Sequence, residues 1–232
     1  MENLPLERIA IRIDDERAVS GLLHVPDRAT ACFVLAHGAG AGMEHAFMTA
    51  TAAGLGQRGI ATLRYQFCFM EAGLKRPDAP RTAHAAVRAA VAEAGRRVPA
   101  LPLFAGGKSF GGRMTSQAQA ETALPRIGGL IFLGFPLHAA RKPADDRARH
   151  LSDVHIPMLF LQGTRDLLAE PSLLIQVAAH LGLLATLHLV ADADHSFHVP
   201  ARSGRTGEQV LGEILDRIVA WIEQIALTVK PL

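Results

Sequence analysis

The chain has 232 residues, of which 49% are hydrophobic, and this length and apolar content are enough to bury a substantial core. Its formal net charge is only +2, the charges are interspersed, and 5% of the residues are aromatic, so no nucleic-acid partner is expected. No apolar run approaches the roughly 18 residues of a membrane span and the first residues show no signal peptide, so no membrane partner is expected either.

The first half of the chain alternates between strand-like and helix-like segments. Four strands are expected, the first an exposed edge strand and the second its hairpin partner: residues 6–14, 21–25, 31–36 and 60–67. Helices are expected over 43–58 and over 82–97, where Thr82 is a candidate N-cap, and a loop is expected over 70–80.

The second half continues this alternation. The apolar run that begins at Pro102 leads into Ser109 and a helix that reaches about Ala120. The later strands and helices are expected over residues 127–135, 157–162, 171–181, 186–190 and 211–225. Alternating strands and helices predict an α/β fold, with a mainly parallel central sheet and helices on both faces. We expect one domain over residues 1–232 and no large lid, because only 137–153 separates the sixth and seventh strands.

Ser109 stands in the pattern Gly107-Lys108-Ser109-Phe110-Gly111, which is G-x-S-x-G at a strand-to-helix turn. Such a turn lifts the serine hydroxyl clear of the sheet, and glycines are needed where a Cβ would collide with the neighbouring strand and helix. A phosphate-binding loop is the rival interpretation of Gly107-Lys108-Ser109. That loop needs a further glycine at position 102, where this chain has proline. The sequence therefore favours a nucleophilic serine.

Two further polar residues follow predicted strands at the same edge of the sheet. Asp166 comes after the strand at 157–162 and His195 after the strand at 186–190. A serine hydroxyl needs a histidine base, and the histidine needs a carboxylate that fixes its tautomer. The order Ser109, Asp166, His195 is the order of α/β-hydrolases, and we expect these residues to form a catalytic triad. The competing acids and the competing base are Asp153, Asp192, Asp194 and His198.

Acyl transfer also needs two backbone donors for the oxyanion. One is expected to be the N–H of Phe110, directly after the serine, and the other the N–H of Ala39 in the glycine-rich loop after the third strand. His37 begins that loop and is expected to brace it. The residues expected to line the substrate pocket are His37, Gly40, Phe135 and Phe197.

Several segments between residues 37 and 197 resemble the α/β-hydrolase superfamily: 37–43, 106–114, 132–138, 162–166 and 194–197. They are most similar to its dienelactone-hydrolase-like branch, and within it to a hydrolase-like family related to a regulatory subunit of a histone acetyltransferase complex and to testis-expressed proteins. The resemblance implies the α/β-hydrolase fold and the triad Ser109, Asp166 and His195. Phe110 departs from the methionine common in such turns. The dienelactone hydrolase nucleophile is cysteine, so that substrate is not carried over to Ser109.

Two classes of function are compatible with these features. The first is a serine hydrolase with carboxylesterase-like activity, which acts on a small ester, thioester or related acyl substrate through an acyl-enzyme. The second is a non-catalytic scaffold or interaction protein on the same fold, and the intact Ser, Asp and His argue against it. Other chemistry on the same triad, such as that of a peptidase or transferase, stays open. The basic loop 137–153 is either a solvated surface loop or a site that attracts an anionic substrate.

The expected environment and partners follow from a few residues. Cys32 and Cys68 stand alone in a long chain, which indicates a reducing compartment, and a cytoplasmic location is expected. His195 and His198 have no second ligand cluster at metal spacing, so neither a metal nor a cofactor is expected. The expected partner is a small-molecule acyl substrate, and a homodimer is left open.

Overall fold

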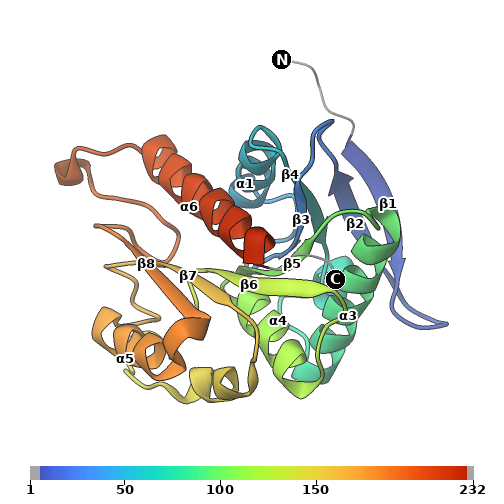
Figure 1. Ribbon diagram of the computed structural model, residues 1–232. Coiled ribbons are helices and arrows are strands. Elements are labelled where there is room, and N and C mark those ends of the chain that lie inside the picture. The colour runs from blue at the N-terminus through green and yellow to red at the C-terminus, as the bar shows by residue number, and fades with distance from the viewer. Residues whose placement is uncertain (1–5, 229–232) are drawn as a thin grey trace.

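The computed structural model describes residues 6–228, and they are built around one central sheet (Figure 1). Among these residues the sheet has eight strands: β1 (Leu6–Arg12), β2 (Ala18–His24), β3 (Ala31–Ala36), β4 (Ile60–Tyr65), β5 (Leu103–Lys108), β6 (Ile127–Leu133), β7 (Met158–Gly163) and β8 (Ala185–Val190). Their order is β1-β2-β4-β3-β5-β6-β7-β8. β1–β2 and β2–β4 pair antiparallel, and all pairs from β4 to β8 are parallel. The mainly parallel sheet predicted from the sequence is therefore confirmed.

Helices cover both faces of the sheet, with α1 and α6 on one face and α3, α4 and α5 on the other (Figure 1). The α-helices are α1 (Ala46–Gly56), α2 (Cys68–Glu71), α3 (Pro80–Arg97), α4 (Phe110–Glu121), α5 (Pro171–Leu181) and α6 (Gly207–Thr228). Alternate side chains of β3 enter opposite cores: Phe33 and Leu35 pack with α1 and α6, whereas Cys32 and Val34 pack on the other side. A strand buried on both faces needs no polar side, which explains its continuous apolar run.

α1 and α3 begin at residues other than those expected, for local reasons. α1 begins at Ala46, because His45 is its N-cap and His45 Nδ1 accepts the N–H of Phe47 at 3.3 Å. Thr82 is not the N-cap of α3. That helix begins at Pro80, whose fixed φ and missing N–H suit the first helical position.

Two segments contain short helices that the sequence did not predict. β4 ends at Tyr65, earlier than expected, and α2 follows it directly. The loop between β6 and β7 contains the 3₁₀ helix η1 (Asp146–Asp153), which packs against α4. Two further 3₁₀ helices are η2 (Gly182–Leu184) and η3 (Ala201–Ser203). The part of the chain that the structure describes has no other helix between β6 and β7, so there is no large lid, as predicted.

The carboxyl ends of the parallel strands meet along one edge of the sheet, and polar residues follow several of them. His37 comes directly after β3 and Ser109 directly after β5, while Asp166 and His195 lie in the loops after β7 and β8. Because ligands bind at this edge of parallel sheets, the fold brings the candidate residues to the place where a site is expected.

Candidate active site

Ser109 lies at a sharp turn between β5 and α4, with backbone angles φ 48° and ψ −110°. Positive φ is strained for a residue other than glycine, and such strain gathers at functional sites. Neighbouring backbone crosses the turn closely. A Cβ on Gly107 would lie 2.1 Å from the carbonyl oxygen of Ala36, and one on Gly111 would lie 2.5 Å from that of His37. The structure therefore requires glycine on both sides of the serine.

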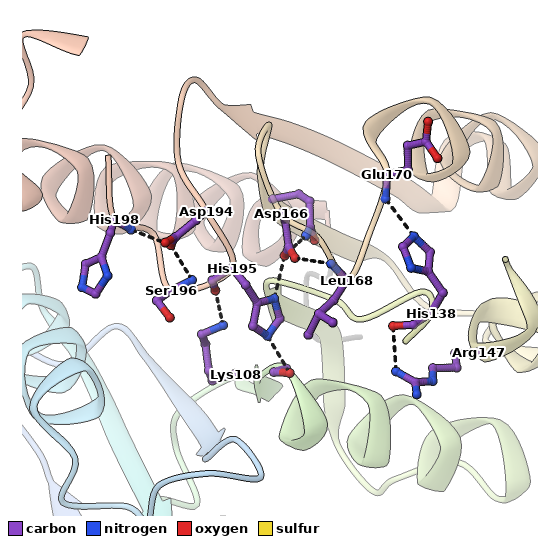
Figure 2. Close-up of polar contacts among 12 residues, drawn as sticks. Lys108, His138, Arg147, Asp166, Leu168, Glu170, Asp194, His195, Ser196 and His198 are labelled. Carbon is purple, nitrogen blue, oxygen red and sulfur yellow. Dashed lines mark hydrogen bonds and ion pairs between the residues drawn. The ribbon is translucent and has the colours of Figure 1, made fainter. Parts of the chain in front are cut away.

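The imidazole of His195 connects Ser109 with Asp166, and Figure 2 shows its contact with Asp166. Its Nε2 lies 2.9 Å from Ser109 Oγ, and its Nδ1 lies 2.6 Å from Asp166 Oδ2. The Asp166 side chain is fully buried, whereas that of His195 is 24% exposed. A carboxylate that accepts Nδ1–H leaves Nε2 free to accept a proton from the serine hydroxyl. The structure thus brings together three residues that lie far apart in the sequence.

Three donors hold the carboxylate of Asp166. Besides the contact with His195, Oδ2 accepts a hydrogen bond from Gln162 Nε2 at 2.5 Å. Oδ1 accepts the backbone N–H of Leu168 at 2.8 Å. Because both carboxylate oxygens are engaged, the side chain is held in one orientation, and through it the ring of His195 is held as well.

Four competing residues lie outside the hydrogen-bonded group of Ser109, His195 and Asp166: Asp153, Asp192, Asp194 and His198. Asp194 Oδ1 accepts the N–H groups of Ser196 and His198 at 2.8 and 2.9 Å, so this carboxylate closes the turn that carries His195. Asp192 is exposed. Within residues 6–228, none of these four side chains makes a hydrogen bond to the ring of His195.

His37 braces the loop after β3 through two hydrogen bonds that define its tautomer. The backbone N–H of Phe67 donates to Nε2 at 3.0 Å, so the ring proton is on Nδ1, which lies 2.7 Å from the carbonyl oxygen of Gly38. Burial lowers the pKa of His37 to about 4, which favours the neutral ring. The N–H of Ala39 belongs to the same trans peptide unit as the Gly38 carbonyl and points the opposite way. His37 therefore fixes the direction of the Ala39 N–H.

A cavity of about 710 Å³ opens beside Ser109. Ala39 and Gly40 line it from the loop after β3, and the stacked rings of Phe47 and Phe197, with centroids 5.8 Å apart, line it from α1 and from the His195 turn. No carboxylate lines it in the described part of the chain. The cavity therefore offers an apolar surface directly beside the serine hydroxyl.

The other two residues expected in the pocket do not line it. His37 is fully buried beneath its own loop, where its ring packs edge-on against Phe67. Phe135 is 1% exposed and packs against Phe132 and Phe160 in the core. Both follow strands, as the sequence shows, but the sequence pattern does not tell which side of the loop each ring occupies.

A second cavity, of about 640 Å³, lies beyond His195 and is also lined by Asp166. Arg141 and Arg165 line it together with the acid Glu170. Its walls are therefore richer in charged side chains than those of the first cavity, which are mainly apolar. The imidazole therefore lines two cavities of different character.

Phe47 and Lys108 are among the residues that line the cavity beside Ser109 and that the sequence did not reveal as pocket residues. The place of Lys108 directly before the serine is the one signal that marks it. Phe47 carries no such signal, because it meets Phe197 only through the packing of α1 on the sheet.

Residues 6–228, the part of the chain that the structure describes, contain no group of three or more His, Cys, Asp or Glu side chains placed to hold a metal ion. None of their helices combines the length and the apolar character needed to cross a membrane.

Solved structures share this fold. Dienelactone hydrolase from Anabaena variabilis matches with a TM-score of 0.76 and 20% identity, over 95% of this chain and 97% of that one. An alpha-beta serine hydrolase homologue from Coxiella burnetii gives 0.72 and 16%, over 95% and 97% of the two chains. A member of the a/b serine hydrolases without lid, from Xanthomonas campestris, gives 0.71 and 20%, over 93% and 94%. At these identities the likeness establishes the fold.

The sequence itself matches a family described as alpha/beta hydrolase domain over residues 29–223. The matched region runs from β3 through most of α6, and it contains Ser109, Asp166 and His195. Most of the described fold and all three residues of the site thus lie inside the match. The chain belongs to the alpha/beta hydrolase domain family.

Proposed function

We propose that the protein is a serine hydrolase that cleaves a small ester, thioester or related acyl substrate through an acyl-enzyme on Ser109. The observation that carries the proposal is the placement of the His195 ring, 2.9 Å from the Ser109 hydroxyl and 2.6 Å from the buried Asp166 carboxylate. A serine hydroxyl becomes a useful nucleophile only when a base takes its proton as it attacks.

In the first half-reaction, Ser109 Oγ attacks the carbonyl carbon of the substrate while its proton passes to His195 Nε2. Asp166 accepts the Nδ1–H bond and stabilises the imidazolium that forms. The carbon–oxygen or carbon–sulfur bond to the leaving group then breaks. The leaving alcohol or thiol takes the proton from Nε2, and the acyl group stays on Ser109.

In the second half-reaction, water takes the place of the alcohol. His195 Nε2 accepts a proton from the water as its oxygen attacks the acyl carbon, and then returns that proton to Ser109 Oγ as the acyl–serine bond breaks. The products are a carboxylic acid and the free serine. One water molecule is consumed in each turnover, and the proton that His195 takes from it returns to Ser109.

Two backbone N–H groups serve as the oxyanion donors in this proposal. Phe110 is the first residue of α4, where N–H groups have no partner within the helix. Ala39 lines the cavity, and His37 fixes the direction of its peptide unit through the Gly38 carbonyl. Loss of one such donor typically costs on the order of 10²–10³ in kcat.

The cavity supports a small acyl substrate. Its volume is about 710 Å³ and its walls are mainly apolar, with the stacked pair Phe47 and Phe197 among them. No lid covers it within the described residues, so it offers little buried surface for a long lipid chain. Solved structures named as dienelactone hydrolase and as esterases share the fold, which agrees with this substrate class.

The alternative is a non-catalytic scaffold. Within its family we place the chain beside the hydrolase-like proteins related to a histone acetyltransferase regulatory subunit, some of which act as parts of complexes. The hydrogen-bonded arrangement of Ser109, His195 and Asp166 favours catalysis, because a scaffold has no need of it.

The test is hydrolysis of p-nitrophenyl esters of increasing acyl length by the purified protein and by Ser109→Ala. The proposal expects turnover of the acetate and butyrate, little turnover of the palmitate, and only the background rate with Ser109→Ala. Thermal unfolding of both proteins shows that the variant is folded. A folded wild-type protein that hydrolyses none of the esters, or a Ser109→Ala variant with unchanged turnover, contradicts the proposal.

A further inference from the structure

His195 sits in a short turn, residues 194–198, that is closed by its own hydrogen bonds. The N–H of Asp194 donates to the carbonyl of His198 at 2.9 Å, and the N–H of Phe197 donates to the carbonyl of Asp194 at 3.0 Å. Phe197 has a positive φ of 62°, which is strained for a large aromatic residue. The turn is therefore held in one shape, but these bonds do not attach it to the sheet.

The residue before the turn, Ala193, accepts the N–H of Arg165 at 2.9 Å, and the turn itself is attached by Lys108, as Figure 2 shows. Its Nζ donates to the carbonyl oxygen of His195 at 2.5 Å. Apart from the two contacts of the imidazole ring, this is the only hydrogen bond within residues 6–228 that joins the turn 194–198 to another segment. The same ammonium lies 5.4 Å from the centre of the Phe197 ring, within the range of a cation–π interaction. One side chain thus holds the turn at two points.

The surroundings of Lys108 are unusual for a lysine. Burial lowers its pKa to about 8, although Asp166 and Asp194 act in the opposite direction. No carboxylate in the described part of the chain forms a salt bridge with it. Gly134 leaves room beside it, because a Cβ there would lie 3.1 Å from Lys108 Nζ and 3.4 Å from His195 Nδ1. A half-buried ammonium that bonds to the carbonyl of a base, and not to an acid, calls for an explanation beyond stability.

We propose that Lys108 is a positioning residue, which anchors the turn 194–198 to β5 and so sets the distance between Ser109 Oγ and His195 Nε2. The inference rests on the proposed role of Ser109 as the nucleophile. The backbone of Lys108 ends β5 and leads directly into Ser109, while its side chain reaches His195. One residue therefore links the base to the nucleophile. A misplacement of about 1 Å between reacting groups is enough to lower the rate about 10²-fold.

The test compares three variants on p-nitrophenyl acetate. Lys108→Met keeps the length of the side chain but removes the donor and the charge, Lys108→Arg keeps a charged donor, and Lys75→Met changes an exposed lysine as a matched control. We expect Lys108→Met to lower kcat about 10- to 100-fold with little change in KM, because alignment and not binding is lost. The rate constant for inactivation by a fluorophosphonate should fall by a similar factor. Lys108→Arg should recover most of that loss, and Lys75→Met should match the wild type.

Thermal unfolding separates positioning from a purely structural role. Lys108→Met removes a half-buried charge that has no salt-bridge partner, so its Tm should be equal to or higher than that of the wild type. Unchanged kcat in Lys108→Met overturns the inference, and so does a loss of kcat that follows a loss of Tm and is not recovered by Lys108→Arg. Should Lys108→Met fail to fold, Lys108→Gln, a shorter neutral donor, takes its place with the same expected loss. A wild-type protein that neither hydrolyses esters nor reacts with a fluorophosphonate contradicts the proposed function instead, before any variant is compared.

Discussion

Replacing Asp166 by asparagine separates the chemical role of this carboxylate from its structural role. Asp166 Oδ2 faces two groups, His195 Nδ1 at 2.6 Å and Gln162 Nε2 at 2.5 Å, while Oδ1 accepts the N–H of Leu168 at 2.8 Å. In Asp166→Asn the amide oxygen has to stay opposite Leu168, because the other orientation would set two donors against each other. The new amide nitrogen therefore takes the place of Oδ2.

The neighbouring Gln162 can adapt to this change. Its Oε1 has no hydrogen-bond partner in the described structure, and a flip of its amide would turn that oxygen towards the new nitrogen of Asp166→Asn. The second N–H of the new amide would then donate to His195 Nδ1, which forces the ring proton onto Nε2. Nε2–H points at Ser109 and cannot accept its proton. The fold is thus preserved while the base is in the wrong tautomer.

We therefore expect kcat for p-nitrophenyl acetate to fall about 10⁴-fold in Asp166→Asn, as in serine proteases with the same substitution, which corresponds to about 5 kcal/mol of transition-state stabilisation. The Tm should change little. Asp194→Asn is the matched control, because its amide oxygen can still accept the N–H groups of Ser196 and His198. Asp192→Asn changes an exposed residue. A larger loss of kcat in either control than in Asp166→Asn would refute the assignment of the acid.

Two further predictions concern His37. His37→Phe keeps a ring but removes the hydrogen bond that orients the Gly38–Ala39 peptide, so kcat should fall by up to about 10²–10³-fold. The N–H of Phe67 loses its acceptor, which should cost about 1–3 kcal/mol of stability. A kcat within twofold of the wild type would contradict this role of His37. Because burial lowers the pKa of His37 from 6.5 to about 4, its contribution to stability is full above pH 6.5 and is lost as the pH falls towards 4, by about 3 kcal/mol. Urea unfolding at pH 7 and pH 4 should show a smaller acid loss in His37→Phe than in the wild type, and equal losses would contradict this account.

Much of the fold could be predicted from the sequence because its signals are local. The apolar runs at β3, β5 and β7 are short and uninterrupted, as strands buried on both faces must be. The site followed from topology, since Ser109, Asp166 and His195 each come after a parallel strand and those ends meet at one edge. The places of these three residues after predicted strands were therefore enough to predict that they lie close together.

Other features of the fold and the site depend on side-chain packing, which a single sequence does not reveal. Thr82 was expected to cap α3, but Pro80 suits the first position of a helix without a side-chain cap. Phe135 follows β6 as a pocket residue would, yet its ring turns into the core against Phe132. The contact of Lys108 with His195 joins residues 87 positions apart. This contact depends on the direction of the Lys108 side chain, and no periodic pattern in the sequence predicts that direction.

The central claim is that Ser109 is an activated nucleophile, and labelling with a fluorescent fluorophosphonate tests it most directly. The matched control is Ser116→Ala, because Ser116 is also hydrogen-bonded to a histidine, with its Oγ 2.7 Å from His150 Nε2, but is fully buried. The account predicts that the wild type and Ser116→Ala are labelled, and that Ser109→Ala and heat-unfolded protein are not. Absence of label on the folded wild type, or label that persists in Ser109→Ala, would contradict it.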